Sequence, residues 1–517
     1  LTCGAPEQKE TKPIVEPVKI KGRIQIDEIK YSGPPKESWI VAGIRDTVTN
    51  DLAKVKEVEA ISIDDQNKAL SMIAERRKAG EKNLDPSKEA AKVLAADYLC
   101  VGNLQNTGKV LRLNIRLLKA PDFSAEQTAT IDGTLDEIFT LQDKVVESLL
   151  ANVDAKMKPE ERLAIEVFTP KNKRAYELYA QGLEIVNTNP KKALDLFLEA
   201  LKLEPDYLNA LNKVGIMLYS SFDKYKDALD YFNKCKSKLE EKGLKSHEMY
   251  SAILSNIASV YKYQEMYDDA LIYYFKAKQI DEELGRAKTK SYATLLNNLG
   301  GVYDSQKKYK EALEYYFKSK QIEEELRLTK TSGYATTLSN IGLLYISQQN
   351  YGEALKYLLN ANIIEEENGF SKTKNHAMTL MNIGGVYDSQ EKYDDALIFF
   401  IKAKKTLEDI GLVQTRMYAS VLRTIGGIYK EKNSLDDALK YFFDSKKILE
   451  KLGLEKTRDY ADLLGSSIGG IYYSKGDYCK SAEWARMAVN IQESIGVPSR
   501  RDNLEAAQEE CNASKRR

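Results

Sequence analysis

A regular spacing of 42 residues between alanines constrains the fold of this chain more than any other sequence feature. These alanines are Ala228, Ala270, Ala312, Ala354, Ala396 and Ala438. About twelve residues before most of them stands a small residue that a tyrosine follows three residues later. The small residues are Ala258, Gly300, Gly342, Gly384 and Gly426. A fixed period of this length is typical of a solenoid built from supersecondary repeats.

Within one period, the apolar and small residues follow the spacing of an α-helix. One helix face is formed by Tyr267, Ala270, Leu271, Tyr274, Ala277 and Ile280. The segment just before it, around 254–263, is also helical in pattern and carries the small residue where two helix axes approach most closely. Each unit is therefore predicted to be an antiparallel helix pair whose apolar face is covered only by stacking on its neighbours.

The repeated string resembles the tetratricopeptide repeat, in the long variant found in kinesin light chains. The residues that carry the resemblance are Asn297-Asn298-Leu299-Gly300-Gly301-Val302-Tyr303, followed by Tyr309-x-x-Ala312-Leu313. Eight units can be counted, a short first one from Tyr179 to Pro205 and a last one in which Ser481 replaces the anchoring alanine. The resemblance implies an all-α, right-handed superhelix that binds protein partners.

Before the repeats, residues 20–158 show a mixed pattern of strands and helices. Strands are expected at 23–27, 58–63, 98–104 and 110–118, and helices at 39–54, 66–82, 87–94 and 135–155. Gln105-Asn106-Thr107-Gly108 has the composition of a hairpin turn between the last two strands. The fold class is therefore α+β with two parts, an α/β domain followed by the helical array.

This first domain resembles the amino-terminal domains of TolB-like proteins, which are related to the lipoproteins CsgG and FlgO. The resemblance rests on the segments 40–46, 95–102, 111–117 and 138–143, and it is diffuse. It contains no catalytic motif. It implies recognition or assembly in the bacterial envelope, and it leaves open a role beside signalling modules.

The chain begins with Leu1-Thr2-Cys3-Gly4 and continues with a polar, proline-containing stretch. This resembles the mature end of a bacterial lipoprotein, with a lipid on Cys3 and a flexible tether. The leucine stands two residues before the cysteine and not the usual three, so an incidental cysteine in a disordered terminus is the alternative. The predicted organisation is a tether (1–19), the α/β domain (20–158), a linker (159–173), the array (174–497) and a tail (498–517).

Several chemistries find no support in the sequence. Lys+Arg and Asp+Glu both number 77, so no basic excess favours a nucleic-acid partner. No apolar run reaches the ~18–20 residues of a membrane span. The five cysteines and two histidines lack metal-ligand or redox-motif spacing. The segment 102–110 resembles a phosphate-binding loop but has five residues between its glycines and a strand-like continuation. We therefore expect no catalysis, no cofactor and no metal.

In repeats of this type the first helix of each pair lines a groove, and the residue after the small anchor points into it. The candidate partner-binding residues are Gly301, Asp304, Gly385, Asp388, Gly427 and Lys430. Small residues let a ligand backbone approach, but a Gly-Gly pair also allows close helix packing, and both readings stay open. The recurring Asn256, Asn298, Asn340 and Asn382 are interpreted as structural residues of the repeat consensus.

These observations favour a non-enzymatic scaffold that binds protein partners in its groove and is anchored as a lipoprotein facing the periplasm. One alternative is a subunit of an oligomeric secretion or assembly complex, formed through the CsgG-like domain. The other is a cytoplasmic regulator that acts with a separate cyclase or kinase. Because the pattern changes beyond Pro170, the two parts are also expected to fold independently.

Overall fold

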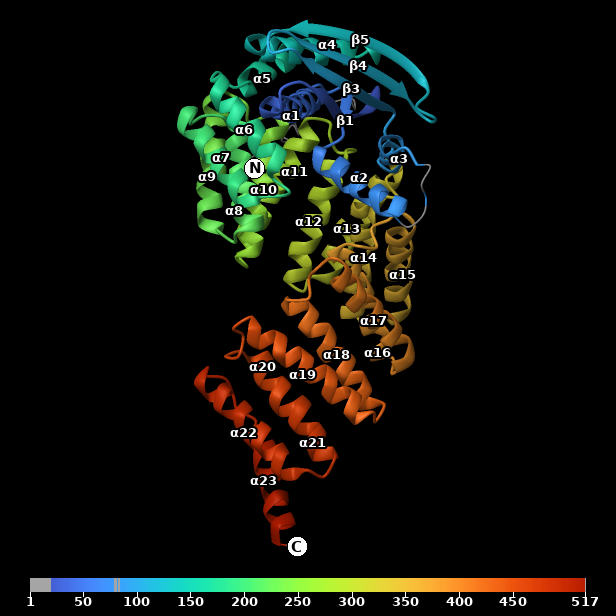
Figure 1. The fold of residues 1–517 in the computed structure, drawn as a ribbon, viewed down its shortest axis with the longest axis vertical. Coiled ribbons are helices and arrows are strands. Elements are labelled where there is room, and N and C mark those ends of the chain that lie inside the picture. Colours follow the sequence, from blue (N-terminus) through green and yellow to red (C-terminus); the bar gives the residue numbers. More distant parts are fainter. Residues whose placement is uncertain (1–19, 79–80, 82–83, 517) are drawn as a thin grey trace, which may run out of the picture. The chain divides into compact units, whose positions relative to one another are not determined.

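The computed structural model describes residues 20–78, 81 and 84–516. The predicted tether and Cys3 lie outside the described residues. The chain forms two compact units, Leu1–Thr337 and Leu338–Arg517, and each is described by itself. The first unit contains the α/β domain and the first repeats, and the second contains the later repeats (Figure 1).

The α/β domain is built on a sheet with the strand order β2-β1-β3-β4-β5. The strands are β1 (Gly22–Ser32), β2 (Val58–Ala60), β3 (Tyr98–Asn106), β4 (Leu111–Lys119) and β5 (Ala125–Gly133). Strand β1 pairs in parallel with β2 and β3, and β3, β4 and β5 pair antiparallel. The hairpin predicted at 105–108 joins β3 to β4. Strand β5 was not predicted, because its alternation of Ala129 and Ile131 with polar residues is short and contains one large apolar side chain.

Helices cover the sheet at the places where the sequence predicts helical spacing. They are α1 (Trp39–Ala53), α2 (Ile63–Lys78), α3 (Pro86–Val93) and α4 (Ile138–Asn152). The residues of α1 at four-residue spacing, Ile40, Ile44, Val48 and Leu52, are all fully buried. Together with α4 and one face of β1, β3 and β4, they form the core of the domain.

This core also contains residues of the first repeat. Helix α5 (Pro159–Phe168) lies in the predicted linker, and α6 (Lys173–Ile185) begins the repeats. Tyr176 and Ala180 of α6 are fully buried in the core of the α/β domain. A Cβ added at Gly43 of α1 would lie 2.4 Å from the Tyr176 hydroxyl. The shared core argues against the expectation that the two parts fold independently, because separating them would expose Tyr176.

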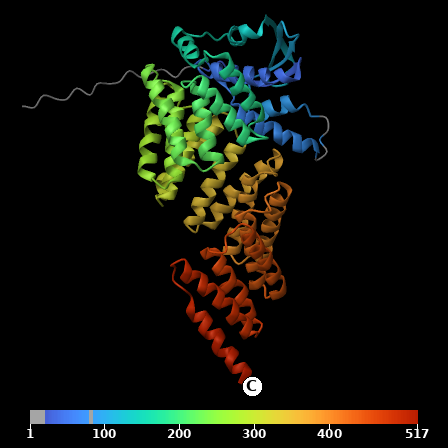
Figure 2. The ribbon, with the colours of Figure 1, turned by 60° about the vertical axis from the view of Figure 1, so that its left-hand side comes forward.

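Within the described residues, the repeats comprise eight helix pairs, numbered here from one to eight (Figure 2). The pairs of the first unit are α6 with α7 (Pro190–Leu203), α8 (Leu208–Ser221) with α9 (Tyr225–Glu241), α10 (Glu248–Tyr263) with α11 (Tyr267–Glu283), and α12 (Lys290–Ser305) with α13 (Tyr309–Glu325). The fifth pair begins with α14 (Ser332–Ser347), which contains the boundary between the units, and ends with α15 (Tyr351–Glu367). The others are α16 (Lys374–Ser389) with α17 (Tyr393–Asp409), α18 (Arg416–Glu431) with α19 (Leu435–Lys451), and α20 (Arg458–Asp462), η3 (Leu463–Gly469) and α21 (Gly470–Ser474) with α22 (Tyr478–Ser494).

The small anchor residues lie where the two helices of a pair are closest, as the sequence predicts. A Cβ on Gly300 would stand 2.7 Å from the ring of Tyr316, and one on Gly426 would stand 2.8 Å from the ring of Phe442. A larger residue at Gly300 or Gly426 requires the facing ring or helix to shift. The anchor is therefore a packing residue.

The last repeat contains one residue more than the 42-residue period. Gly469 follows Gly426 by 43 positions, and the extra residue lies in η3, a π-helix within the first helix of the pair. A π-turn accommodates one inserted residue without breaking a helix. Ser481 therefore occupies the anchoring alanine's place one residue later than the period predicts.

The predicted tail is not an extension without structure. Residues Arg501–Arg516 form α23, and a disulfide between Cys479 and Cys511 joins α23 to α22. The cysteines show no pairing pattern in the sequence, because Cys479 and Cys511 stand 32 residues apart and come together only when α23 packs on α22.

Candidate functional site

Two of the predicted groove residues lie in the first unit, where other side chains surround them. The space next to Gly301 is filled by the ammonium group of Lys262, which lies 2.6 Å from where a Cβ would stand. Burial lowers the pKa of Lys262 and raises the pKa of Asp304, and the attraction between the two charges opposes both shifts. The structure thus places Asp304 near Lys262 of the preceding repeat.

The other predicted residues lie in the second unit and have open space before them. A Cβ added at Gly385 or Gly427 would meet no atom within 4 Å, and the same holds for Gly470 in repeat eight. At these positions the structure gives no support to the reading in which glycine is needed for close packing. Half-buried Asp388 and Lys430 follow three residues later on the same helices. We call the surface at Gly385, Gly427 and Gly470 the first-helix face.

In repeat one, the equivalent helix surface is covered by the α/β domain. Tyr176 and Tyr179 precede the anchor Gly182 by six and three residues, so they share a helix face with the position that follows the anchor. Helix α1 packs on both, since Gly43 contacts Tyr176 and the Tyr179 hydroxyl donates a hydrogen bond to Asp46 (3.1 Å). The domain therefore occupies in repeat one the surface that stays open in repeats six to eight.

Buried charges hold the α/β domain against the first repeats. Burial raises the pKa of Asp46, while the charge of Lys213 from α8 and the Tyr179 hydroxyl act in the opposite direction. Lys290 at the start of α12 forms an ion pair with Asp65 of α2 (2.5 Å). The ammonium group of Lys54, which directly follows α1, lies 4.8 Å from the centre of the ring of Phe168 in α5. The domain is thus fixed along several repeats, and no sequence pattern indicates these contacts.

Three carboxylates are buried between neighbouring repeats at one position of the period. Asp281, Glu323 and Glu365 are at most 5 % exposed. The same position holds Leu239, Leu407 and Leu449 in other repeats. Burial raises the pKa of Asp281 to about 6 and that of Glu323 and Glu365 to about 7. Aligning the repeats at the 42-residue period could have identified these carboxylates, because they stand where other repeats have leucine.

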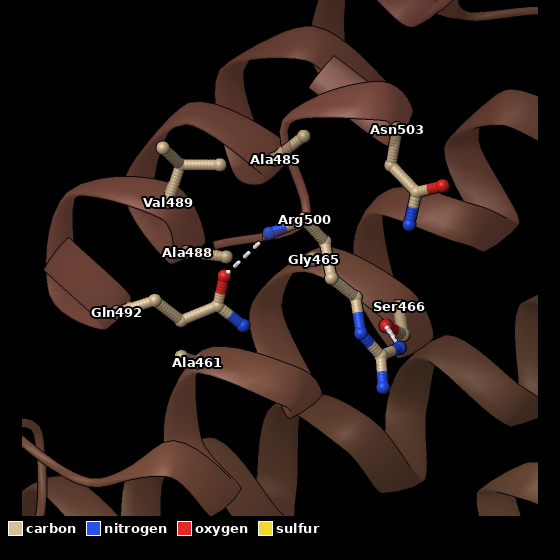
Figure 3. Close-up of a pocket in the computed structure, with 9 residues that line it drawn as sticks. All are labelled: Ala461, Gly465, Ser466, Ala485, Ala488, Val489, Gln492, Arg500 and Asn503. Carbon is tan, nitrogen blue, oxygen red and sulfur yellow. Dashed lines mark hydrogen bonds between the residues drawn. The ribbon is translucent and has the colours of Figure 1, made fainter. Parts of the chain in front are cut away.

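Other candidate sites are a small pocket and any cluster of metal-binding side chains. A pocket at η3, lined by Gly465, Ser466, Gln492 and Arg500 among others, has a volume of about 10 Å³, enough for one water molecule (Figure 3). Among residues 20–78, 81 and 84–516, no three His, Cys, Asp or Glu side chains are placed to hold a metal ion. Nor does that part of the chain contain a helix long and apolar enough to cross a membrane.

Comparison with protein families identifies the repeats. Residues 249–325 and 333–409 match the tetratricopeptide repeat. Repeats of this family are typically non-catalytic interaction modules. Residues 249–409 therefore contain tetratricopeptide repeats, and such repeats support a protein-interaction scaffold.

No curated protein sequence matches the chain. Among solved structures, it is similar to a Rap protein complexed with competence and sporulation factor (17 % identity, 70 % of this chain and 94 % of that one, TM-score 0.42). It is also similar to the apo form of RapI, with 20 % identity over 56 % of this chain and 98 % of that one and a TM-score of 0.42. A third similar structure is BtubC from P. vanneervenii, with 18 % identity over 46 % of this chain and 92 % of that one and a TM-score of 0.37. Similarities at these TM-scores support no statement about function.

Proposed function

We propose that this protein is a scaffold of the bacterial envelope that binds a segment of a partner protein on the first-helix face of repeats six to eight. One observation carries the proposal. The face is open at Gly385, Gly427 and Gly470, whereas helix α1 of the chain itself covers the equivalent surface in repeat one. A helical face that is already covered by a helix in one repeat is suited to bind a helix or an extended segment in others.

Charged groups on this face give the partner site its polarity. Arg423 and Lys430 of α18 stand on either side of Gly427 at helical spacing, and Asp388 of α16 follows Gly385. Both signs of charge are present, so we expect the partner segment to be polar and of mixed charge. The predicted site residues Gly301 and Asp304 are less accessible, because Lys262 lies over Gly301.

Two observations support a location in the envelope. The start Leu1-Thr2-Cys3-Gly4 resembles a lipoprotein end. The disulfide between Cys479 and Cys511 is of a kind that persists in oxidising compartments and is rare in the cytosol, which disfavours the cytoplasmic alternative. Assembly into an oligomer through the TolB-like domain remains the second alternative. Fractionation of cells that express the full precursor, with wild-type Cys3 or Cys3→Ala, tests the anchor.

The experiment for partner binding uses Gly385→Arg. A photo-crosslinking residue at exposed Ser389 captures the partner in cells, and the purified partner is then titrated against wild type and variant. We expect Gly385→Arg to keep the wild-type melting temperature and to weaken binding at least tenfold, about 1.4 kcal/mol. The matched control is Ile363→Arg, which adds the same charge at an exposed position of the second helix α15. Full-strength binding by a folded Gly385→Arg variant would show that the partner binds elsewhere.

A further inference from the structure

The disulfide Cys479–Cys511 is the main link between α23 and the rest of the array. It joins the start of α22 to the second half of α23, with the Cα atoms 4.8 Å apart. Arg500, just before α23, is held by Ser466 and Gln492, and Arg501 is paired with Glu493. Between residues 502–516 and the other described residues, apart from the cysteine pair, no side-chain hydrogen bond or ion pair is present.

Apolar packing adds little to this link. The fully or largely buried residues of α23 are Ala507 and Cys511. An alanine side chain buries little apolar surface, and the hydrophobic contribution scales with buried area. An isolated helix of this length is only marginally stable in water, because nucleation of the first turn is unfavourable and a short helix gains few hydrogen bonds to offset it. The disulfide therefore adds a covalent tie to a helix whose buried side chains, Ala507 and Cys511, are small.

The disulfide is accessible from a pocket between the two helices. This pocket of about 310 Å³ is lined by both cysteines, by Arg486 and Glu483 of α22, and by Gln508 and Lys515 of α23. The pocket opens to solvent, so its lining residues can be reached from outside. Cationic groups near a sulfur favour its thiolate form, so Arg486 and Lys515 assist the departure of a thiolate, while Glu483 opposes it.

We propose that Cys479–Cys511 is a redox latch, and that a dithiol reductant opens it and releases α23 from α22. A thiolate of the reductant attacks Sγ of half-buried Cys479, and buried Cys511 leaves as a thiolate that takes up a proton. The second thiol of the reductant then attacks the mixed disulfide. Cys479 leaves as a thiol, and the reductant becomes a disulfide after transferring two electrons.

Release of α23 changes the end of the array. Helix α23 covers Ala482 and Val489 of α22, which line the two pockets beneath it. Arg500 and Asn503 lie next to Ser466 at the end of repeat eight, as Figure 3 shows. When α23 leaves, these residues lose their fixed positions and the last repeat loses its cap. Terminal caps keep repeat arrays soluble, so the reduced form exposes a stacking surface.

The test is hydrogen–deuterium exchange of the full chain, oxidised or treated with dithiothreitol or a thioredoxin under native conditions. We expect residues 501–516 to exchange at least about tenfold faster after reduction, with α18 unchanged as an internal control. Cys479→Ser should show the fast exchange without any reductant. If this variant fails to fold, reduction of the folded wild type gives the same readout.

Mass spectrometry after thiol alkylation establishes that the bond has been reduced. Labelling should appear at Cys479 and Cys511 and not at buried Cys100 or Cys235. If α23 keeps its protection after complete reduction, packing holds the helix and the latch is refuted. If the bond resists the reductant as long as the chain is folded, the pocket gives no access and the proposal also fails.

Discussion

Replacing buried Glu365 of repeat five by leucine, the residue found at this position in other repeats, tests how much a buried carboxylate lowers the stability of the array. Glu365 is 2 % exposed, and its Oε2 has no hydrogen-bond partner among the described residues. Its neighbours are Thr379 of α16, which hydrogen-bonds to it, and Glu366. One repeat on from α15, the equivalent positions are Leu407 and Val421, both fully buried. The double variant Glu365→Leu/Thr379→Val therefore copies a pair that the chain already uses.

The expected gain depends on pH. Burial raises the pKa of Glu365 from 4.5 to about 7, whereas the hydrogen bond from Thr379 lowers it. Between these two values the folded state binds the proton more tightly than the unfolded state. The free energy of unfolding therefore falls as pH rises from about 4.5 to about 7. At ~1.4 kcal/mol for each pKa unit, the wild type loses about 3 kcal/mol at this site.

Urea unfolding followed by circular dichroism, at about pH 5 and about pH 8, measures the effect. The double variant should exceed the wild type by about 3 kcal/mol more at the higher pH than at the lower pH. Because repeats unfold with their nearest neighbours, hydrogen exchange in α15 and α16 should report the same difference locally. The matched control is Glu367→Leu, which removes an exposed glutamate of the same helix and should keep the wild-type pH dependence.

Two results would refute this reasoning. An equal difference between variant and wild type at both pH values would show that Glu365 does not change its protonation between the folded and unfolded states. A variant less stable than the wild type at both values would show that leucine does not fit between these repeats, so that packing outweighs the removal of the carboxylate.

The remaining predictions concern single sites. Gly384→Ala should lower the free energy of unfolding by about 1–3 kcal/mol, because its Cβ would lie 2.9 Å from the ring of Phe400. The neighbouring Gly385→Ala meets open space and should raise it by about 1 kcal/mol through helix propensity; urea unfolding separates the two. Tyr179→Phe removes a hydrogen bond to buried Asp46 and should cost about 1–3 kcal/mol, and a double-mutant cycle with Asp46→Asn should show coupling. Burial raises the pKa of Cys100 to about 12, so iodoacetamide at neutral pH should label it only after unfolding, as mass spectrometry can measure.

The helical array could be predicted because each repeat is determined by local spacing. The small anchors at 42-residue intervals placed five of the eight helix pairs and their closest contacts, and Gly300 against Tyr316 confirms the reason. The tetratricopeptide assignment is confirmed by the match at residues 249–325 and 333–409. The α/β region was also predicted, except for β5, whose alternating pattern is short and contains one large apolar side chain, Ile131.

The candidate site was predicted only in part. The rule that the residue after the anchor points to open space holds for Gly385 and Gly427, and it fails for Gly301, where the flexible Lys262 from another repeat fills the space. Their role in binding stays a prediction. The TolB-like assignment, the lipid on Cys3 and the envelope location also stay predictions, since they concern a diffuse pattern or residues outside the description.

The sequence by itself determined the repeat, its period and the residues that let two helices of a pair approach, because these depend on neighbours within about 40 positions. Tertiary structure alone decided three other features. It placed Tyr176 of the first repeat in the core of the α/β domain, and it joined Cys479 to Cys511. It also placed α1 over the first helix of repeat one, and it left the equivalent surface at Gly385 open. These features arise from contacts between segments whose spacing in sequence follows no period. No local sequence pattern therefore predicts them.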